Sequence, residues 1–421
     1  MSIICGTDLS AASSGALDVA LALAELRGHD EVILVHVADP DLGAPASREP
    51  ALEHARQELA ALASSKARPA VKIRWELIYG PPDETLASFA DTESSDLIVI
   101  AARSTSSTLL RLGTTASQLI ARAQVPVLVV RNPEPWLAFA RKERPLRLLL
   151  GVDDSATCDL SMQLLHHLRT LGPIELVLGA IYYPDDAAEH YGLHAKGMVD
   201  SDPEIEQLLQ RDLLRRFGGD LTGVCAHARR GLGRIGDHVV ELAREENVDA
   251  IVVGTGQKTG LGRLGSVSSI IVNDAPQSVI CVPPQARIPT RSVPLLRAAL
   301  VATDLSGFSN RAVPYAFALT EPDAEVHVVH TVKEDAEVDT AEITQLLASL
   351  APTGAKQKLI PHVVVGDDAA KAIAQTAARL GVDVICIASH GRAGITRAIV
   401  GSVADRLLRA TRLPVLVLRP A

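Results

Sequence analysis

The chain has 421 residues, enough for roughly two to four domains, and 47% of them are hydrophobic, which excludes a disordered chain. Its formal net charge of −9 argues against a nucleic-acid backbone or an anionic membrane surface as the main partner. Only 3% of the residues are aromatic, so the apolar content is mainly Val, Leu, Ile and Ala, which is typical of strands covered by helices on both faces.

The cysteines and the N-terminus indicate an intracellular setting. The five cysteines are odd in number, widely spaced and free of Cys-x-x-Cys pairs: Cys5, Cys158, Cys225, Cys281 and Cys386. Three of them lie in apolar strand-like runs, so we expect buried free thiols rather than disulfides or metal ligands. The start MSIICGTDLS lacks the pattern of a signal peptide, and no uncharged apolar run approaches ~20 residues. We therefore expect a cytoplasmic protein with no membrane or nucleic-acid partner.

Internal repeats organise the chain. Three apolar runs each end in an aspartate followed by a helix-start signal: IICGTDLS (3–10), LLLGVDDS (148–155) and ALVATDLS (299–306). The aspartates Asp8, Asp153 and Asp304 are 145 and 151 residues apart. A second pattern recurs at the same period, in DLIVIAARST…QVPVLVV, DAIVVGTGQK…QSVICVP and DVICIASHGR…RLPVLVL. These repeats predict three tandem copies of one domain.

Within each copy, short apolar runs alternate with amphipathic stretches of helix length. In the third copy, the predicted strands are Leu300–Thr303, Val326–Thr331, Lys358–Val365, Val384–Ala388 and Val415–Leu418. The predicted helices lie near Ser309–Leu319, Asp339–Leu350, Asp368–Leu380 and Ser402–Ala410. This alternation predicts right-handed crossovers and an α/β fold, with an open five-stranded parallel sheet and helices on both faces in each copy.

We predict domains at residues 1–132, 144–284 and 294–421. The joins between them, Arg131–Pro145 and Pro283–Pro294, are rich in proline and charge, as linkers usually are.

The loop after the fourth strand of the third copy carries the chemistry. In open parallel sheets, ligands bind beyond the carboxyl ends of the strands, where this loop and Asp304 both lie. Nine residues separate Gly391 from Gly401, and glycines let backbone N–H groups approach phosphate oxygens. Gly401-Ser402 opens a helix, whose free N–H groups favour an anion. The Ser402 hydroxyl is expected to contact phosphate or to cap that helix, and Arg392 and Arg397 add positive charge.

With this loop, the three copies resemble universal stress protein domains, whose nucleotide-binding members carry Gly, two residues, Gly, nine residues, Gly and then Ser or Thr. The third copy matches at Gly391, Gly401 and Ser402, but has Ala388 where the first glycine is expected. The resemblance implies a Rossmann-like fold of the adenine nucleotide α-hydrolase type. The ligand it implies is ATP, with AMP or ADP as alternatives, and Mg²⁺ as a companion ion.

By the same resemblance, Asp304 would lie against the adenosine, the backbone of Thr331 would read the adenine edge, and Val403 would help to hold the phosphates. The predicted nucleotide-binding residues are Ala302, Thr303, Asp304, Thr331, Ala388, His390, Gly391, Arg392, Gly401, Ser402 and Val403.

The other two copies depart from the motif. The first reads Ala101-Ala102-Arg103-Ser104, eight residues and Gly113-Thr114; the second reads Gly254-Thr255-Gly256-Gln257, seven residues and Gly265-Ser266. A shorter loop cannot follow the same path around a phosphate chain. We therefore expect these two copies to be packing partners, with structural roles for Asp8 and Asp153.

Other motifs have simpler interpretations. His36 and His330, at the end of the second strand of their copies, are expected to be hydrogen-bonded residues at the sheet end. GTGQKTG (254–260) lacks the spacing of a P-loop. No nucleophile, base and orienting group stand together, so we predict no catalytic residue and no metal site. His390 could titrate beside a phosphate, but packing or hydrogen bonding is the favoured role.

We therefore expect a stress-response module that binds an adenine nucleotide in its third domain, with any hydrolysis slow and incidental. The resemblance also implies pairing through the last strand, Pro126–Val130 or Pro414–Leu418, and an odd number of domains leaves one such edge free. A homodimer is therefore expected. The alternatives are a nucleotide-free adaptor that works through protein contacts, and an enzyme on the related scaffold.

Overall fold

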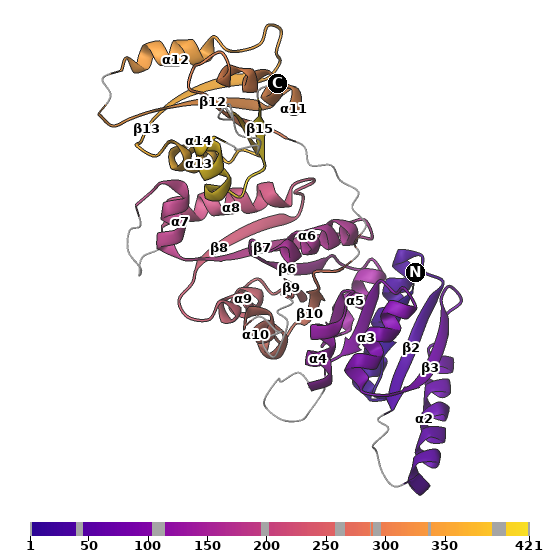
Figure 1. The fold of residues 1–421 in the computed structure, drawn as a ribbon. Helices are drawn as coiled ribbons and strands as arrows, with labels where there is room; N and C mark the ends of the chain where they lie inside the picture. The colour runs from indigo at the N-terminus through magenta and orange to yellow at the C-terminus, as the bar shows by residue number, and fades with distance from the viewer. Residues whose placement is uncertain are drawn as a thin grey trace, which may run out of the picture. The chain divides into compact units, whose positions relative to one another are not determined.

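The computed structural model describes residues 2–38, 45–102, 114–194, 202–256, 266–286, 288, 296–335, 338–389 and 401–419 (Figure 1). The elements of the first copy are β1 (Ile3–Gly6), α1 (Ala11–Arg27), β2 (Glu31–Ala38), α2 (Pro45–Ser65), β3 (Lys72–Tyr79), α3 (Pro82–Thr92), β4 (Leu97–Ala101), α4 (Thr114–Arg122) and β5 (Val127–Val130). Helix α5 (Glu134–Ala140) follows.

Helix α5 occupies the segment that the sequence predicted as the first linker. Trp136 and Phe139 on this helix are buried, and the helix packs against α1. The prediction of an open linker was wrong for residues 134–140, because two aromatic side chains anchor this segment in a core. The second predicted linker lies largely outside the described residues.

The second copy contains β6 (Leu146–Val152), α6 (Ala156–Arg169), β7 (Ile174–Tyr182), α7 (Pro184–Tyr191), α8 (Pro203–Phe217), β8 (Val224–Arg230), α9 (Ile235–Glu245), β9 (Ala250–Gly254), α10 (Ser266–Asp274) and β10 (Ser278–Val282). It places two helices, α7 and α8, in the crossover where the first copy has only α2.

The third copy contains β11 (Ala298–Ala302), the short helix η1 (Ser309–Arg311), α11 (Ala312–Leu319), β12 (Glu325–Val332), α12 (Thr340–Ala348), β13 (Lys358–Val365), α13 (Ala369–Leu380), β14 (Val384–Ala388), α14 (Ser402–Ala410) and β15 (Val415–Leu418). The predicted bounds of β13, β14, β15 and α14 are confirmed. The other predicted elements are present with ends shifted by up to two residues.

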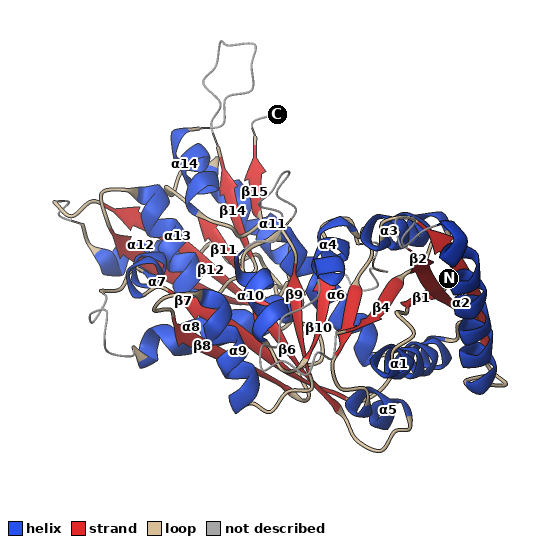
Figure 2. Ribbon diagram, turned by 90° about the horizontal axis from the view of Figure 1, so that it is seen from below, coloured by secondary structure: helices blue, strands red, loops and turns tan. Residues whose placement is uncertain are grey.

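The strand pairs of the third sheet are all parallel, as predicted, and its order is β13-β12-β11-β14-β15. The first two copies, however, share one sheet of ten strands, because β5 and β10 pair antiparallel with Val129 opposite Val279 (Figure 2). The chain order turns back between β11 and β14, which makes the carboxyl end of these two strands the switch point of the third sheet.

Helices cover both faces of the third sheet, so two apolar clusters form. One joins the sheet to α13 and α14, with Ile373 and Leu407 at its centre, and the other joins it to α11 and α12, with Val313 and Leu347. By contacts, the chain divides into two compact units: residues 1–181 with 220–291, and residues 182–219 with 292–421. Helices α7 and α8 thus belong to the second copy in sequence but to the unit of the third copy in structure.

Among the described helices, none combines the length and the apolar character that a membrane span requires.

Candidate functional site at the switch point of the third sheet

Asp304 lies in a tight turn directly after β11, at the switch point. Its carboxylate oxygen Oδ1 accepts a hydrogen bond from the Ser306 backbone N–H at 2.9 Å and another from the Ser309 hydroxyl. Partial burial opposes ionisation, but the bonds from Ser306 and Ser309 outweigh it and lower the pKa of Asp304 to about 2. The site therefore presents a carboxylate at neutral pH.

The buried hydroxyl of Thr303 also holds this turn through hydrogen bonds. It lies 2.8 Å from the Ser309 hydroxyl and accepts the Leu305 N–H at 3.0 Å. Leu305 has a φ of 67°, a conformation that side-chain-bearing residues rarely adopt, so this bond supports a strained position.

Sequence analysis missed Ser309, although a comparison of the copies contains the signal. The first copy has the same arrangement, with the Thr7 and Ser13 hydroxyls 2.8 Å apart. At the equivalent positions, the second copy has Val152 and Cys158, so both hydroxyls are lost together.

Thr331 is the penultimate residue of β12, opposite Val364 of β13. The Val329 carbonyl accepts the Thr303 N–H at 3.0 Å, so residue 329 points its backbone polar groups toward β11. Along a strand, the backbone polar groups of successive residues point alternately to its two neighbouring strands, so those of Thr331 also point toward the β11 side. At this level β11 has already ended, at Ala302. The backbone of Thr331 therefore faces the switch point rather than a paired strand.

The two histidines at the ends of β2 and β12 have the bonded role that was predicted. His330 Nδ1 lies 2.9 Å from the Thr303 carbonyl, and His36 Nδ1 lies 2.9 Å from the Thr7 carbonyl.

The glycine loop starts and ends at one point. Ala388 is the last residue of β14, and the next residue, Ser389, donates its N–H to the Leu418 carbonyl at 2.9 Å. The buried Ser389 hydroxyl accepts the Gly401 N–H at 2.6 Å and so joins the two ends of the loop. Sequence analysis did not single out this hydroxyl. The predicted residues His390, Gly391, Arg392 and Arg397 lie outside the described residues.

Helix α14 begins at this junction. Gly401 is its N-cap residue, and among the described residues no side chain caps it, so the alternative in which Ser402 caps the helix is not what the structure has. Ser402 is the exposed first residue, while Val403 packs partly against the core. An uncapped helix start has free N–H groups and a positive end, both of which favour an anion.

In the first two copies, serines cap the helices that follow the first strand, α1 and α6, whose counterparts in the third copy are η1 and α11. Ser10 caps α1 and Ser155 caps α6, while Asp8 and Asp153 each accept the backbone N–H of the capping serine, at 3.1 and 2.9 Å. The aspartates therefore brace the turn and do not cap the helix themselves.

Gly254 in the second copy matches the first glycine of the motif, but the packing around it accounts for a glycine at this position without any ligand. A Cβ at this position would lie 2.5 Å from the Thr157 hydroxyl oxygen and 2.7 Å from the Thr157 Cβ. Close packing of β9 against α6 therefore requires this glycine.

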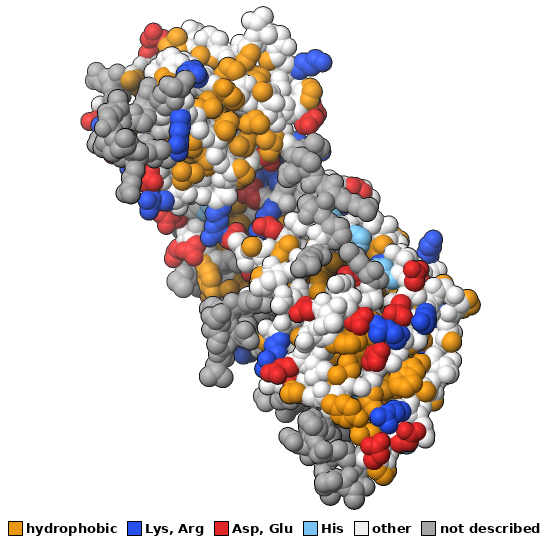
Figure 3. All heavy atoms as spheres, turned by 45° about the vertical axis from the view of Figure 1, so that its right-hand side comes forward, with side chains coloured by type: hydrophobic (Ala, Val, Ile, Leu, Met, Phe, Trp, Pro, Cys, Tyr) orange, Lys and Arg blue, Asp and Glu red, His pale blue; other side chains and the backbone are white. Residues whose placement is uncertain are grey.

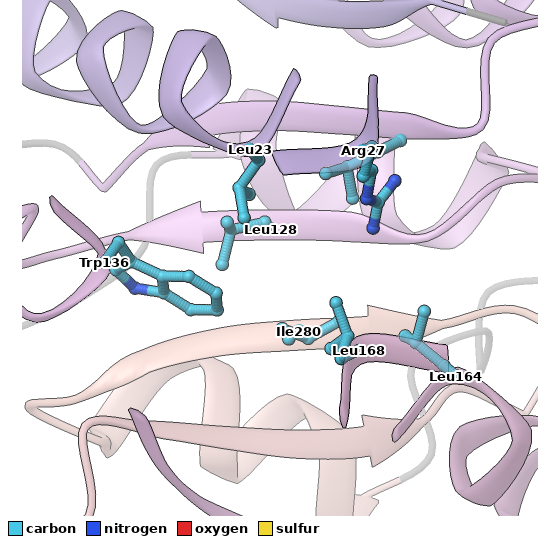
Figure 4. A pocket seen from close by; sticks show the side chains of 8 residues that line it. Leu23, Arg27, Leu128, Trp136, Leu164, Leu168 and Ile280 are labelled. Atoms are coloured by element: carbon cyan, nitrogen blue, oxygen red, sulfur yellow. The ribbon is translucent and has the colours of Figure 1, made fainter. Parts of the chain in front are cut away.

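A small cavity lies elsewhere, where β5 meets β10 (Figure 4). Its volume is about 10 Å³, roughly one water molecule, and its lining is mostly apolar: Leu23, Arg27, Leu97, Leu128, Trp136, Leu164, Leu168 and Ile280. It is a packing defect between two domains rather than a ligand pocket. The described parts of the chain contain no group of three or more His, Cys, Asp or Glu that could hold a metal ion.

All five cysteines are free, and Cys5, Cys281 and Cys386 are buried as predicted. Burial raises the pKa of the Cys5 and Cys281 thiols to about 12, so these thiols are neutral and unreactive at physiological pH.

A five-stranded parallel α/β domain with helices between its strands is present three times, which defines the class of Rossmann-like α/β proteins. The model of the universal stress protein family matches the chain at residues 1–131, 146–283 and 296–419, and the chain belongs to this family.

Among individual proteins, universal stress proteins Rv2005c of Mycobacterium tuberculosis and Mb2028c of Mycobacterium bovis are each 30% identical over 200 residues. Each match covers 43% of this chain and 64% of the relative, so it spans less than two thirds of the length of these relatives. The crystal structure of a universal stress protein from Archaeoglobus fulgidus has a TM-score of 0.52 at 17% identity, covering 67% of this chain and 96% of its own, which is a likeness of fold alone.

Proposed function

We propose that the third domain binds an adenine nucleotide, ATP in the first place, and that the protein acts as a regulatory stress-response module through this binding. The observation that carries the proposal is the bond between Ser389 and Gly401. It holds the uncapped start of α14 at the end of β14, on the same sheet edge as the Asp304 turn.

Each part of the site has chemistry that suits a part of the nucleotide. The Asp304 carboxylate accepts hydrogen bonds from ribose hydroxyls or from the adenine amino group, and the Thr331 backbone faces the same edge. Ala302, Thr303 and Ala388, at the ends of β11 and β14, would lie beneath the bound nucleotide. The N–H groups at Gly401, Ser402 and Val403 suit phosphate oxygens, and His390, Gly391 and Arg392 of the loop, with Mg²⁺, complete the phosphate site.

Binding without efficient turnover follows from the state of Asp304. A carboxylate with a pKa of about 2 is a weak base, far from the neutral range that general-base catalysis needs. Hydrolysis is therefore proposed to be slow and incidental.

The test is to identify small molecules released from the purified full chain and to measure ATP affinity with and without Mg²⁺ by calorimetry. We expect roughly one adenine nucleotide per chain. Gly391→Val should abolish binding, because a branched side chain blocks close backbone approach to phosphate.

A matched pair of variants assigns the site to one copy. Asp304→Asn should weaken binding by about tenfold, on the order of one charged hydrogen bond, whereas Asp153→Asn in the second copy should leave the affinity unchanged. If no nucleotide is released and calorimetry shows no binding heat on adding millimolar ATP, the nucleotide-free adaptor becomes the favoured function.

We further propose that two chains form a homodimer through the edge of the third sheet. Counting from the aspartate after the first strand, Leu23, Leu168 and Leu319 occupy equivalent positions in the three copies. Leu23 and Leu168 are 2% and 4% exposed beside the β5–β10 pairing, but Leu319 is 45% exposed.

The last strands differ in the same way. All residues of β5 and β10 are buried, whereas all four residues of β15 are only half-buried. Apolar side chains gather on the face of the third domain that Figure 3 shows. A second copy of the chain, paired β15 to β15 as β5 pairs with β10, would cover this surface.

A further inference from the structure

Helices α7 and α8 leave the second copy in sequence and pack on α13 of the third, within one compact unit (Figure 1). Contacts run along the length of α13. Near its start, the Lys371 ammonium lies 2.8 Å from the Glu189 carboxylate of α7. One turn later, the Gln375 side chain donates to the Glu189 backbone carbonyl at 2.9 Å.

At the other end, arginines of α8 cap α13. Arg211 donates to the carbonyls of Arg379 and Ala378 at 2.5 and 2.7 Å, and Arg215 donates to the Leu380 carbonyl at 3.3 Å. The last carbonyls of a helix lack partners within the helix and carry its negative end, so guanidinium groups are well suited to this place.

The space around the contact is tight. A Cβ on Gly381, just after α13, would lie 2.7 Å from the Arg215 guanidinium, and a Cβ on Gly192, just after α7, would lie 3.4 Å from the Gln375 Cβ. The neighbours at Gly381 are the movable ends of arginine side chains, and the atoms of Gln375 nearest to Gly192 leave room for a small side chain after a slight shift.

Two histidines lie near this contact, on the sheet face that α13 covers. His327 of β12 is 5% exposed, and its Nδ1 lies 3.0 Å from Nε2 of His362 on β13. Such a bond needs one N–H and one lone pair. If both rings carried two hydrogens, two N–H groups would face each other and the pair would have to separate.

The charged groups around the pair are mostly positive. Arg215 of α8, Arg379 of α13 and Lys358 of β13 all disfavour added protons, and Glu325 of β12, 3.7 Å from His327, favours them. Burial first, then the neighbouring His362, and after it Arg215 and Lys358 lower the pKa of His327 to about 4. Burial first and then Arg379 lower the pKa of His362.

We propose that α7 and α8 form a clamp that the second copy contributes to the third domain, and that His327 and His362 open this clamp on acidification. Release would remove the positive charge of Arg215 from the pair, so the pKa of His327 would rise from about 4 toward its ordinary value of 6.5. The released state would then bind more protons than the docked state between these two pH values. Falling pH in this window therefore favours release, by up to about tenfold per pH unit for each proton.

A cross-link tests the clamp in the full chain. In a Cys225→Ser background, Gly192→Cys with Gln375→Cys should form a disulfide without added oxidant catalyst, because the two Cβ positions are close to disulfide range. The control is Gly192→Cys with Gln345→Cys, which places the second thiol on α12, across the sheet. Cross-linking no faster than in this control would overturn the clamp.

Hydrogen exchange, corrected for its intrinsic pH dependence, tests the opening. Between pH 7.5 and pH 5, exchange in α8 and in the C-terminal half of α13 should rise by about tenfold or more in the wild type. The disulfide-bonded protein and the His327→Gln/His362→Gln variant should show no such rise. Equal protection of the wild-type helices at the two pH values, or an equal rise in the disulfide-bonded protein, would overturn the proposed opening.

Discussion

The Ser309 hydroxyl links the end of β11 to the Asp304 turn, because it contacts both Thr303 and Asp304. Ser309→Ala should destabilise the third domain by about 1–2 kcal/mol, since buried Thr303 loses a partner. The same change should raise the pKa of Asp304 toward its ordinary value of 3.8. Urea unfolding and NMR titration of the full chain would measure the two effects.

The pH dependence has a definite sign. Because the native pKa of Asp304 is lowered, its contribution to stability is present above pH 3.8 and is lost as the pH falls toward about 2. Ser13→Ala in the first copy is the matched control, and it should destabilise its own domain while leaving ATP affinity unchanged. If Ser309→Ala leaves both stability and the pKa of Asp304 unchanged, the turn does not depend on this hydroxyl.

Among single residues, the sequence predicted Asp304 but not the hydroxyl groups that support its turn. Asp304 was found because strand, aspartate and helix signal repeat three times. Ser309 and Ser389 were missed because the partner of a hydroxyl depends on the path of a turn. For Ser309 the only signal is the matching Thr7 and Ser13 pair of the first copy.

Helix α5 shows how an element can hide in a segment that resembles a linker. Its exposed face carries Glu134 and Arg141, which form an ion pair at 2.6 Å, while Trp136 and Phe139, three residues apart, face the core. Composition therefore predicted a linker, although the apolar spacing was that of a helix. The strands of the third copy were predicted well because a polar residue or a glycine follows each apolar run: Thr303, Lys333, Gly366, Ser389 and Arg419.

Trp136 is the test of this element. Its side chain is 1% exposed and lines the small cavity between β5 and β10. Trp136→Ala should lower the free energy of unfolding by about 3–5 kcal/mol, and Trp136→Phe by roughly 1 kcal/mol, because most of the buried ring surface is kept. A change below about 0.5 kcal/mol on urea unfolding of Trp136→Ala would mean that α5 does not anchor the junction.

For the whole molecule, the sequence predicted three copies, and the family resemblance predicted pairing through a last strand, which the β5–β10 pair confirms. It did not predict which of the three last strands pair. The last strands VLVV, SVICV and VLVL are apolar except for Ser278 and rich in β-branched residues, so local sequence does not decide which of them pair. Pairing depends on the tertiary path between copies. The short connection through α5 brings β5 and β10 together in one sheet, and β15 then remains the edge strand of the other.

The free edge leads to the last prediction. Antiparallel pairing of a strand with its own copy is compatible with two-fold symmetry, so a β15–β15 dimer closes without further chains. The wild type should sediment with the mass of two chains. Leu319→Asp should weaken the dimer by two to three orders of magnitude, about 3–4 kcal/mol, because each of the two chains would bury one unpaired carboxylate in the interface. Leu346→Asp is the control, since Leu346 is as exposed as Leu319 but lies on α12. A monomeric wild type at micromolar concentration would refute the pairing. Equal loss in both variants would show that solubility, rather than the α11–β15 surface, holds the chains together.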